Sequence, residues 1–190
     1  MAGRAGPGDA GDMAAVAAAL RTARRVAILG GAGAGKSTLA RVLGDRLGLP
    51  VVHLDRLRFG PGWAEVDPAL FRQRIAEAAQ GDAWVVDGTY GEARELMLPR
   101  AEVVLWLDQP ALRRVWRSWR KVVRHRGRPR ADRPDGCEEA FGWMYARTIF
   151  SFGAWTPAVG AWLRKGAPSA LVVRVRGDGN AARLRRALGA

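Results

Sequence analysis

The stretch GGAGAGKST at residues 30–38 decides the fold class. It satisfies the pattern G-x-x-x-x-G-K-S/T, and it joins an apolar run at residues 26–29 to a segment with apolar residues at helical spacing around 39–47. A glycine-rich turn between a strand and a helix directs backbone N–H groups toward an anion, and the helix N-terminus adds a partial positive charge. The stretch therefore predicts a loop that binds the phosphates of a nucleotide.

The residue types of this loop suit ATP and Mg²⁺ as cofactors. We expect Lys36 to bridge the β- and γ-phosphates and the Ser37 hydroxyl to ligate Mg²⁺. The residues expected to hold the nucleotide are Gly31, Ala32, Gly33, Ala34, Gly35, Lys36, Ser37 and Thr38.

A magnesium site also needs a carboxylate, and two aspartates directly follow apolar runs, Asp87 and Asp108. The carboxyl ends of parallel strands form the edge where ligands of open α/β folds bind. We predict Asp87 as the metal residue, because Gly88 beside it permits a close backbone approach. Asp108 is the competitor, but the Pro110 that follows it indicates a helix start, so capping that helix is its expected task.

Asp55 follows a further apolar run and is expected at the same edge. A carboxylate here can orient an acceptor hydroxyl or take its proton. The alternative is a turn aspartate that pairs with Arg56 or Arg58. We interpret His53 as a packing residue, and we consider Trp63, in a Gly/Pro loop, as a border of an acceptor pocket.

Strand-like and helix-like segments alternate along the chain. Apolar runs predict five strands, at residues 26–29, 51–54, 83–86, 103–107 and 171–175. Besides the helix around 39–47, which Gly48 and Pro50 should end, helices are expected at residues 14–24, 69–79, 92–98, 111–123 and 180–188. Asp67 should cap the second of these five, with Pro68 at its first position. Continuous apolar strands are typical of a parallel sheet covered on both faces. The sequence predicts an α/β, three-layer P-loop NTPase fold, with a five-stranded parallel sheet and helices on both faces.

The length of 190 residues fits one domain with one core. Residues 1–12 are rich in Gly, Ala and Pro and are expected to be disordered. With the short helix at 14–24 they form a leader, residues 1–24, and residues 25–190 are expected to form a single domain.

The composition excludes several classes of protein. Cys137 is the only cysteine, so no intramolecular disulfide and no cysteine-based zinc site can form, and a reducing cytoplasm fits. No apolar run approaches the ~18 residues that a membrane span needs. We therefore expect a cytoplasmic protein without a membrane partner.

The formal net charge is +13, and residues 113–133 hold ten Arg or Lys and one acid, Asp132. Such a segment indicates a polyanionic partner. One hypothesis is that its arginines close over a triphosphate; the alternatives are a solvated basic face and a docking surface for DNA or RNA backbones. Trp116 and Trp119 lie on the apolar face of the expected helix at 111–123, so we predict them as core residues.

Several motifs together resemble a group of small P-loop proteins similar to adenylate kinase, the DNA topology modulation proteins. The matching motifs are GAGAGKST at 31–38, VVHLD at 51–55, PGW at 61–63, WVVDGTY at 84–90 and R-G-x-x-R-x-D at 126–132. The resemblance implies a nucleoside-kinase-like core, an acceptor-binding region at about 55–80 and a mobile arginine-rich lid at about 124–136. It also implies that Arg126 and Arg130 are lid arginines.

These observations predict an ATP-dependent phosphotransferase that acts on a small acceptor, with Lys36, Asp55, Arg126 and Arg130 as catalytic residues and Ser37 and Asp87 at the metal. One alternative is a nucleic-acid-associated ATPase or regulator that binds DNA through residues 113–133. Another is an ATP-binding protein with slow hydrolysis only.

Overall fold

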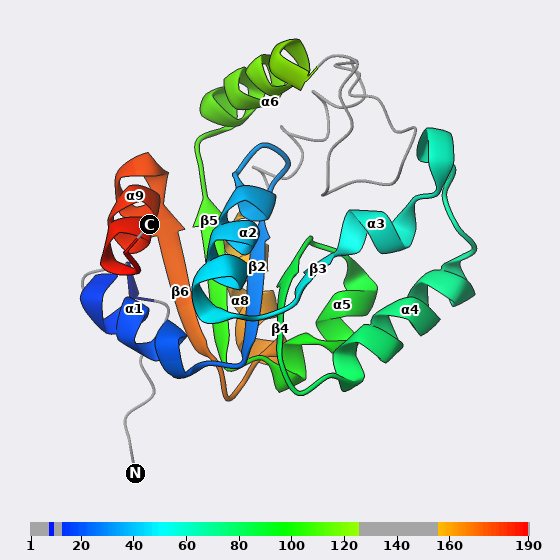
Figure 1. Ribbon diagram of the computed structural model, residues 1–190, viewed down its shortest axis with the longest axis horizontal. Helices are drawn as coiled ribbons and strands as arrows, with labels where there is room; N and C mark the ends of the chain where they lie inside the picture. Colours follow the sequence, from blue (N-terminus) through cyan, green and yellow to red (C-terminus); the bar gives the residue numbers. More distant parts are fainter. Residues whose placement is uncertain (1–7, 10–12, 126–155, 190) are drawn as a thin grey trace.

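The structure is a computed structural model that describes residues 8–9, 13–125 and 156–189 (Figure 1). Its sheet is entirely parallel, and the strand order is β1-β6-β5-β2-β4-β3. The strands are β1 Gly8–Asp9, β2 Arg25–Gly30, β3 Val51–His53, β4 Trp84–Asp87, β5 Val103–Asp108 and β6 Leu171–Arg176. Since β2 lies between β4 and β5, the predicted phosphate loop leaves the middle of the sheet.

Helices connect these strands and cover the sheet. The α-helices are α1 Met13–Thr22, α2 Lys36–Leu47, α3 Leu54–Arg58, α4 Pro68–Gln80, α5 Gly91–Leu96, α6 Ala111–His125, α8 Thr156–Gly166 and α9 Gly177–Ala187. Two short 3₁₀ turns, η1 Pro61–Trp63 and η2 Leu98–Arg100, complete the described elements. None of the described helices is both long and apolar enough to cross a membrane.

Local signals in the sequence set two of the helix ends. The Asp67 side chain accepts hydrogen bonds from two backbone N–H groups in the first turn of α4, and Pro68 is the first residue of that helix. Gly48 ends α2 in the left-handed conformation (φ +64°), where its N–H donates to the Gly44 carbonyl. Both ends agree with the sequence-based prediction.

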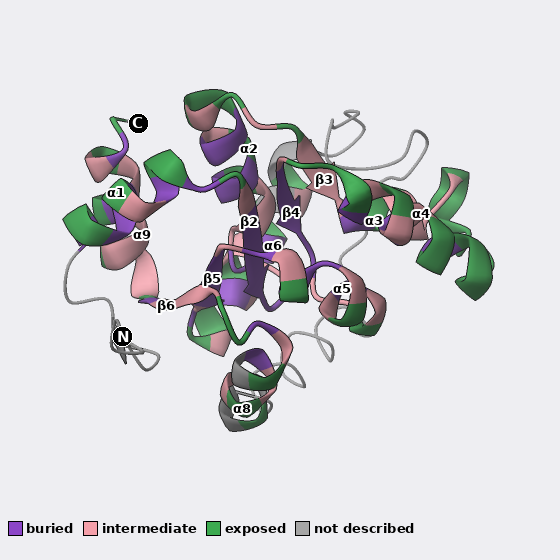
Figure 2. Ribbon diagram, turned by 90° about the horizontal axis from the view of Figure 1, so that it is seen from below, coloured by how far each residue is buried: buried purple, intermediate pink, exposed green. Residues whose placement is uncertain are grey.

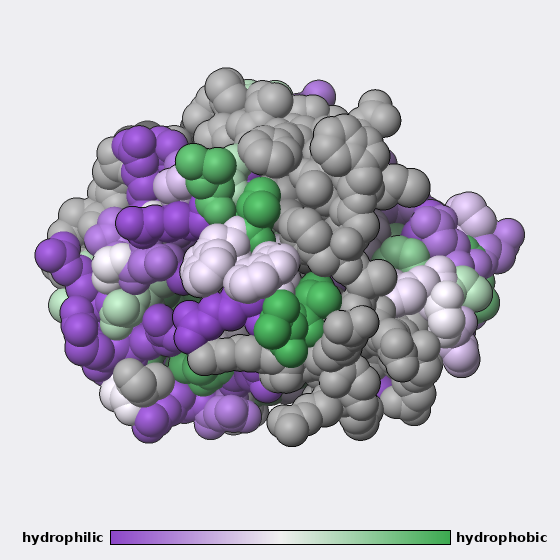
Figure 3. All heavy atoms as spheres, turned by 90° about the horizontal axis from the view of Figure 1, so that it is seen from above, coloured by the Kyte–Doolittle hydropathy of each residue, from purple (hydrophilic) through white to green (hydrophobic). Residues whose placement is uncertain are grey.

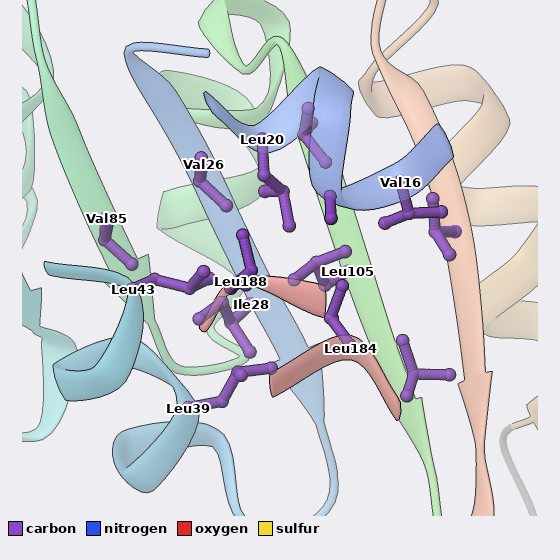
Figure 4. Close-up of a cluster of buried hydrophobic side chains, with 14 of the residues drawn as sticks. Val16, Leu20, Val26, Ile28, Leu39, Leu43, Val85, Leu105, Leu184 and Leu188 are labelled. Carbon is purple, nitrogen blue, oxygen red and sulfur yellow. The ribbon is translucent and has the colours of Figure 1, made fainter. Parts of the chain in front are cut away.

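The core has two halves, one on each face of the sheet. Along β2 the side chains alternate: Val26 and Ile28 pack against α1, α2 and α9, whereas Ala27 and Leu29 pack against α4, α5 and α8. Figure 2 shows the buried strands between helix layers, and Figure 4 shows the first half of the core. This confirms the predicted three-layer α/β class.

The sheet has one strand more than predicted. β1 pairs with β6 through Gly8 and Asp9, so the prediction of a disordered leader is wrong at these two residues. Strand pairing uses backbone hydrogen bonds, which need no apolar side chains, and the composition therefore gave no signal.

The helix predicted at residues 14–24 is α1, and it packs into the main core. Leu20 is fully buried, and Met13, Val16 and Ala17 are buried beside it. Their neighbours in that half of the core include Leu184 of α9, so the two ends of the described chain meet on one face of the sheet (Figure 4).

Candidate active site

The predicted phosphate loop curls between the end of β2 and the start of α2. Gly30, Gly33 and Gly35 have φ values of +147°, +76° and +97°, a range that side chains disfavour. The Ala34 N–H donates to the Gly31 carbonyl at 3.1 Å, which closes the turn. The first turn of α2 has neither a side-chain cap nor an acidic residue. The first turn of α2 thus leaves its N–H groups available to an anion.

Lys36 lies inside this loop. Its Nζ donates to the Gly31 carbonyl at 3.2 Å. Burial lowers the pKa of Lys36, and the nearby carboxylates Asp55 and Asp87 oppose this by favouring the charged form. The site therefore brings a partly desolvated ammonium group together with both predicted aspartates.

Asp87 ends β4 and lies next to His53, which ends β3. The two residues are directly opposite each other in the parallel register. Asp87 is only 5% exposed, and its Oδ1 is 2.6 Å from Nδ1 of His53. At this distance the two side chains share a hydrogen bond.

The interpretation of His53 as a packing residue missed this contact. The signal was present in the sequence, because His53 and Asp87 both end predicted strands. Recognising it required knowing that these two strands are neighbours.

Asp108 ends β5, but its carboxylate is held by another strand. Arg174 of β6 donates from Nε to its Oδ2 at 2.9 Å. The helix α6 begins at Ala111, three residues later, so the expected capping role is wrong. The Asp108 carboxylate pairs with Arg174 of β6 rather than with the N-terminus of α6. Because this pairing occupies Asp108, Asp87 is the better candidate for the metal residue.

The segment from Asp87 to Tyr90 links the phosphate loop to Asp55. The Thr89 hydroxyl accepts from the Gly30 N–H at 3.3 Å and donates to the Gly30 carbonyl at 3.2 Å. The next residue, Tyr90, donates its hydroxyl to Asp55 Oδ1 at 2.7 Å. Two consecutive side chains therefore fix Asp55 relative to the loop.

Asp55 itself lies in the first turn of α3, because β3 ends at His53, one residue before the end predicted for that strand. Among the described residues, its hydrogen-bond partner is Tyr90 rather than Arg56 or Arg58. Arg58 pairs with Glu65 instead. Trp63 is partly exposed in η1 and packs edge-to-face on Phe59, with 5.4 Å between ring centroids.

The basic helix α6 lies above the phosphate loop (Figure 1). A Cβ on Gly33 would stand 2.5 Å from both the Arg114 carbonyl oxygen and the Ser118 hydroxyl, so the helix approaches the loop as closely as a glycine permits. Arg117 donates to the Ala34 carbonyl at 3.4 Å and pairs with Asp178 of α9. Part of the positive charge of residues 113–133 is therefore beside the predicted nucleotide site.

Solved structures share the fold of this chain. A shikimate kinase from Acinetobacter baumannii, in complex with shikimate, matches 90% of this chain and 93% of its own length with a TM-score of 0.57 at 20% sequence identity. The chain has the fold of the small P-loop kinases. A gluconokinase from Sinorhizobium meliloti 1021 matches 87% of this chain and 90% of its own, with a TM-score of 0.50 and 17% identity. No family model matches the sequence and no curated protein is similar to it, so the resemblance to the DNA topology modulation proteins is not confirmed.

The residues at the P-loop fit a magnesium ion. Ser37 and Asp87 offer a hydroxyl and a carboxylate, which are the oxygen ligands that Mg²⁺ prefers, and the ion keeps several waters besides. The described residues contain no group of three or more His, Cys, Asp and Glu side chains that would form an all-protein metal cage. The donor set therefore suits an ion that reaches the P-loop together with nucleotide phosphates.

The apolar side of α6 faces away from the P-loop, so the prediction of Trp116 and Trp119 as core residues is wrong. They are 56% and 46% exposed and stack on each other with 5.2 Å between ring centroids. Leu112 and Val123 extend this exposed stripe, which Figure 3 shows among hydrophilic side chains. The inner side of α6 carries the buried residues Arg114 and Ser118, whose backbone carbonyl and hydroxyl, respectively, lie against Gly33 of the P-loop.

Two predicted catalytic arginines, Arg126 and Arg130, lie outside the described residues, as does Cys137. The same holds for most of the expected lid at 124–136. The other predicted site residues, in the loop at 31–38 and at Asp55 and Asp87, lie on segments that follow the neighbouring strands β2, β3 and β4.

Proposed function

We propose that the protein is an ATP-dependent phosphotransferase, which transfers the γ-phosphoryl group of ATP to a small acceptor. One observation carries this proposal: the P-loop with Lys36 follows β2, and two carboxylates lie at the same edge of the sheet, Asp87 at the end of the neighbouring strand β4 and Asp55 directly after β3. Phosphoryl transfer needs a phosphate cradle, a metal carboxylate and a group that orients the acceptor, and these residue types match the three needs.

Each residue has a distinct role in this proposal. The N–H groups of residues 31–38 and the Lys36 ammonium bind the phosphates, and Ser37 and Asp87 hold Mg²⁺. When bound, the metal ion neutralises charge on the transferring group. Asp55 orients the acceptor, and Arg126 and Arg130 close over the transferring phosphoryl group.

The direct test is ADP release from Mg-ATP, measured with and without a panel of nucleosides, sugars and nucleoside monophosphates. We expect acceptor-dependent ADP release that Lys36→Ala lowers by about 10²-fold or more. Lys165→Ala, which removes an exposed lysine of α8, is the matched control and should have no effect. Equal rates for Lys36→Ala and the wild type would refute the assignment, and release that no acceptor stimulates would favour the slow-hydrolysis alternative.

The exposed tryptophan pair on α6 favours a second candidate, a nucleic-acid-associated ATPase. Trp116 and Trp119 lie near exposed Arg113 and Arg120, a combination that suits stacking on bases and contacts with phosphates. One contact counts against this candidate: Arg113 forms an ion pair with Asp178 at 3.6 Å, and this carboxylate offsets part of the positive charge that a phosphate would need. This candidate would be supported if single-stranded DNA binds and its affinity falls as the salt concentration rises. The slope of log affinity against log salt concentration should then be smaller for Arg120→Ala than for the wild type.

A further inference from the structure

Among the described residues, one oxygen of Asp55 has a hydrogen-bond partner and the other has none. Oδ1 accepts the hydroxyl of Tyr90 at 2.7 Å. Tyr90 in turn packs edge-to-face on Phe71 of α4, with 5.2 Å between ring centroids, and the preceding residue, Thr89, is tied to Gly30. The phenol is thus fixed on both sides, and it fixes the plane of the Asp55 carboxylate.

Burial and the charge of Asp55 raise the pKa of Tyr90 far above its ordinary value. Tyr90 therefore keeps its proton at every pH at which the protein would work. It acts only as a hydrogen-bond donor to Asp55, which stabilises the ionised carboxylate.

The described arginines of α3, α4 and α5 all take part in interactions within the protein. Arg58 and Arg72 form ion pairs with glutamates, Glu65 and Glu95 respectively, and Arg58 also lies over the Phe71 ring. Arg74 donates to the Leu57 carbonyl, and Arg94 lies over the Trp162 ring. Arg56 takes part in an interaction as well. A phosphate-bearing acceptor needs free cations or N–H groups, and a carboxylate repels it. The charges of these helices suit an uncharged acceptor better.

We infer that the acceptor presents a neutral hydroxyl group rather than a phosphate, and that Tyr90 is a positioning residue that aims the free oxygen of Asp55 at that hydroxyl. The inference rests on the proposed phosphotransfer function and specifies its acceptor class. It excludes nucleoside monophosphates as the principal acceptors.

The transfer step balances as follows in atoms and charge. The acceptor oxygen forms a bond to Pγ of ATP while the bond between Pγ and the β–γ bridging oxygen breaks, and ADP leaves with that electron pair. The acceptor proton passes to Oδ2 of Asp55. The products are a phosphomonoester and ADP, and Asp55 then releases its proton to water.

A double-mutant cycle tests the positioning role. The reaction measured is the hydrolysis of ATP, in which water is the smallest hydroxyl acceptor, and the quantities compared are kcat and the KM for ATP. Asp55→Asn should lower kcat by roughly 10²- to 10⁴-fold, Tyr90→Phe by about tenfold, and both should leave the KM for ATP unchanged. Because Tyr90 acts only through Asp55, the double variant should be no slower than Asp55→Asn alone. Asp82→Asn, at an exposed aspartate before β4, is the matched control.

Two kinetic results would overturn the inference. One is a kcat of Asp55→Asn that equals or exceeds that of the wild type. The other is a double variant whose loss is the product of the two single losses, which would show that Tyr90 supports the fold rather than the carboxylate.

A binding experiment tests the acceptor class without any turnover. The protein is saturated with Mg²⁺ and the non-hydrolysable analogue AMP-PNP, and AMP, CMP, GMP, UMP and dTMP are then titrated by calorimetry. We expect no binding tighter than about 1 mM, a level that corresponds to about 4 kcal/mol. Micromolar binding of any of the five would overturn the acceptor class alone, whereas failure to bind AMP-PNP would overturn the proposed function beneath it.

Discussion

The proposed role of Lys36 predicts that ATP binding is sensitive to alkaline pH. Its ammonium must be protonated to bind phosphate, and burial lowers its pKa from the ordinary 10.5. The cation is present below that pKa and is lost as the pH rises through it, so ATP affinity should begin to fall at a pH lower than 10.5 as the solution is made alkaline. Calorimetric titrations across this range would measure the fall. Lys36→Arg, which keeps its charge, should show no such step, and a flat wild-type profile up to pH 10.5 would contradict the prediction.

Under the proposed function, His53 should govern how tightly Asp87 helps to hold Mg²⁺, because Nδ1 of His53 lies 2.6 Å from one oxygen of Asp87. Removal of such a supporting partner typically weakens metal binding by about 10- to 100-fold. His53→Leu should therefore weaken Mn²⁺ binding to the ADP complex by about tenfold or more, as measured by electron paramagnetic resonance.

The amide of His53→Asn can donate from nearly the same position, so this variant should recover most of the Mn²⁺ affinity. ADP binding without metal should be the same in all three proteins. Equal Mn²⁺ affinity in the leucine variant and the wild type would show that the contact is only structural.

At the scale of elements, the contact between α6 and the P-loop depends on Gly33. A Cβ there would collide with two atoms of α6 at 2.5 Å, and φ is +76°. Gly33→Ala should therefore displace the helix, lower the free energy of unfolding by about 1 to 3 kcal/mol and weaken ATP binding at least tenfold.

Gly48→Ala provides the matched control for Gly33→Ala. Gly48 has a similar φ of +64°, but nothing lies within 4 Å of an added Cβ. Gly48→Ala should lower the free energy of unfolding through backbone strain, as measured by urea unfolding. Its ATP affinity, measured by calorimetry, should equal that of the wild type. Equal ATP affinities in the two variants would mean that α6 does not support the loop.

The elements that the sequence predicted are those set by local patterns. The P-loop, the five apolar strands and the cap at Asp67 all depend on residues close together in the chain. The contacts of His53 with Asp87 and of Tyr90 with Asp55 join residues that are 34 and 35 positions apart. They could not be predicted without the strand order, which the sequence alone does not fix.

The orientation of α6 could not be predicted for a different reason. Its periodicity marks an apolar side, but the periodicity cannot tell which side packs on the protein. The side with Arg114 and Ser118 packs on the P-loop, and the apolar side with Trp116 and Trp119 is exposed.

For the whole molecule, the described core is expected to unfold as one unit that includes α1. Leu20 of α1 is fully buried, whereas Leu112 of α6 is 78% exposed. Leu20→Ala should lower the free energy of unfolding by about 2 to 5 kcal/mol in a single urea transition. The same change at Leu112 should cost less than about 0.5 kcal/mol. A first transition that removes only part of the helical signal would show instead that α1 unfolds apart from the core.

The central claim is that the loop at residues 30–37 binds the polyphosphate of a nucleotide. Isothermal titration of the protein with Mg-ATP and Mg-GTP tests it most directly, with Lys36→Ala as the comparison and circular dichroism to confirm that the variant is folded. We predict saturable binding to the wild type and a loss of affinity on the order of 10²-fold in the variant. No heat of binding with either nucleotide, or equal affinity in the two proteins, would contradict the account.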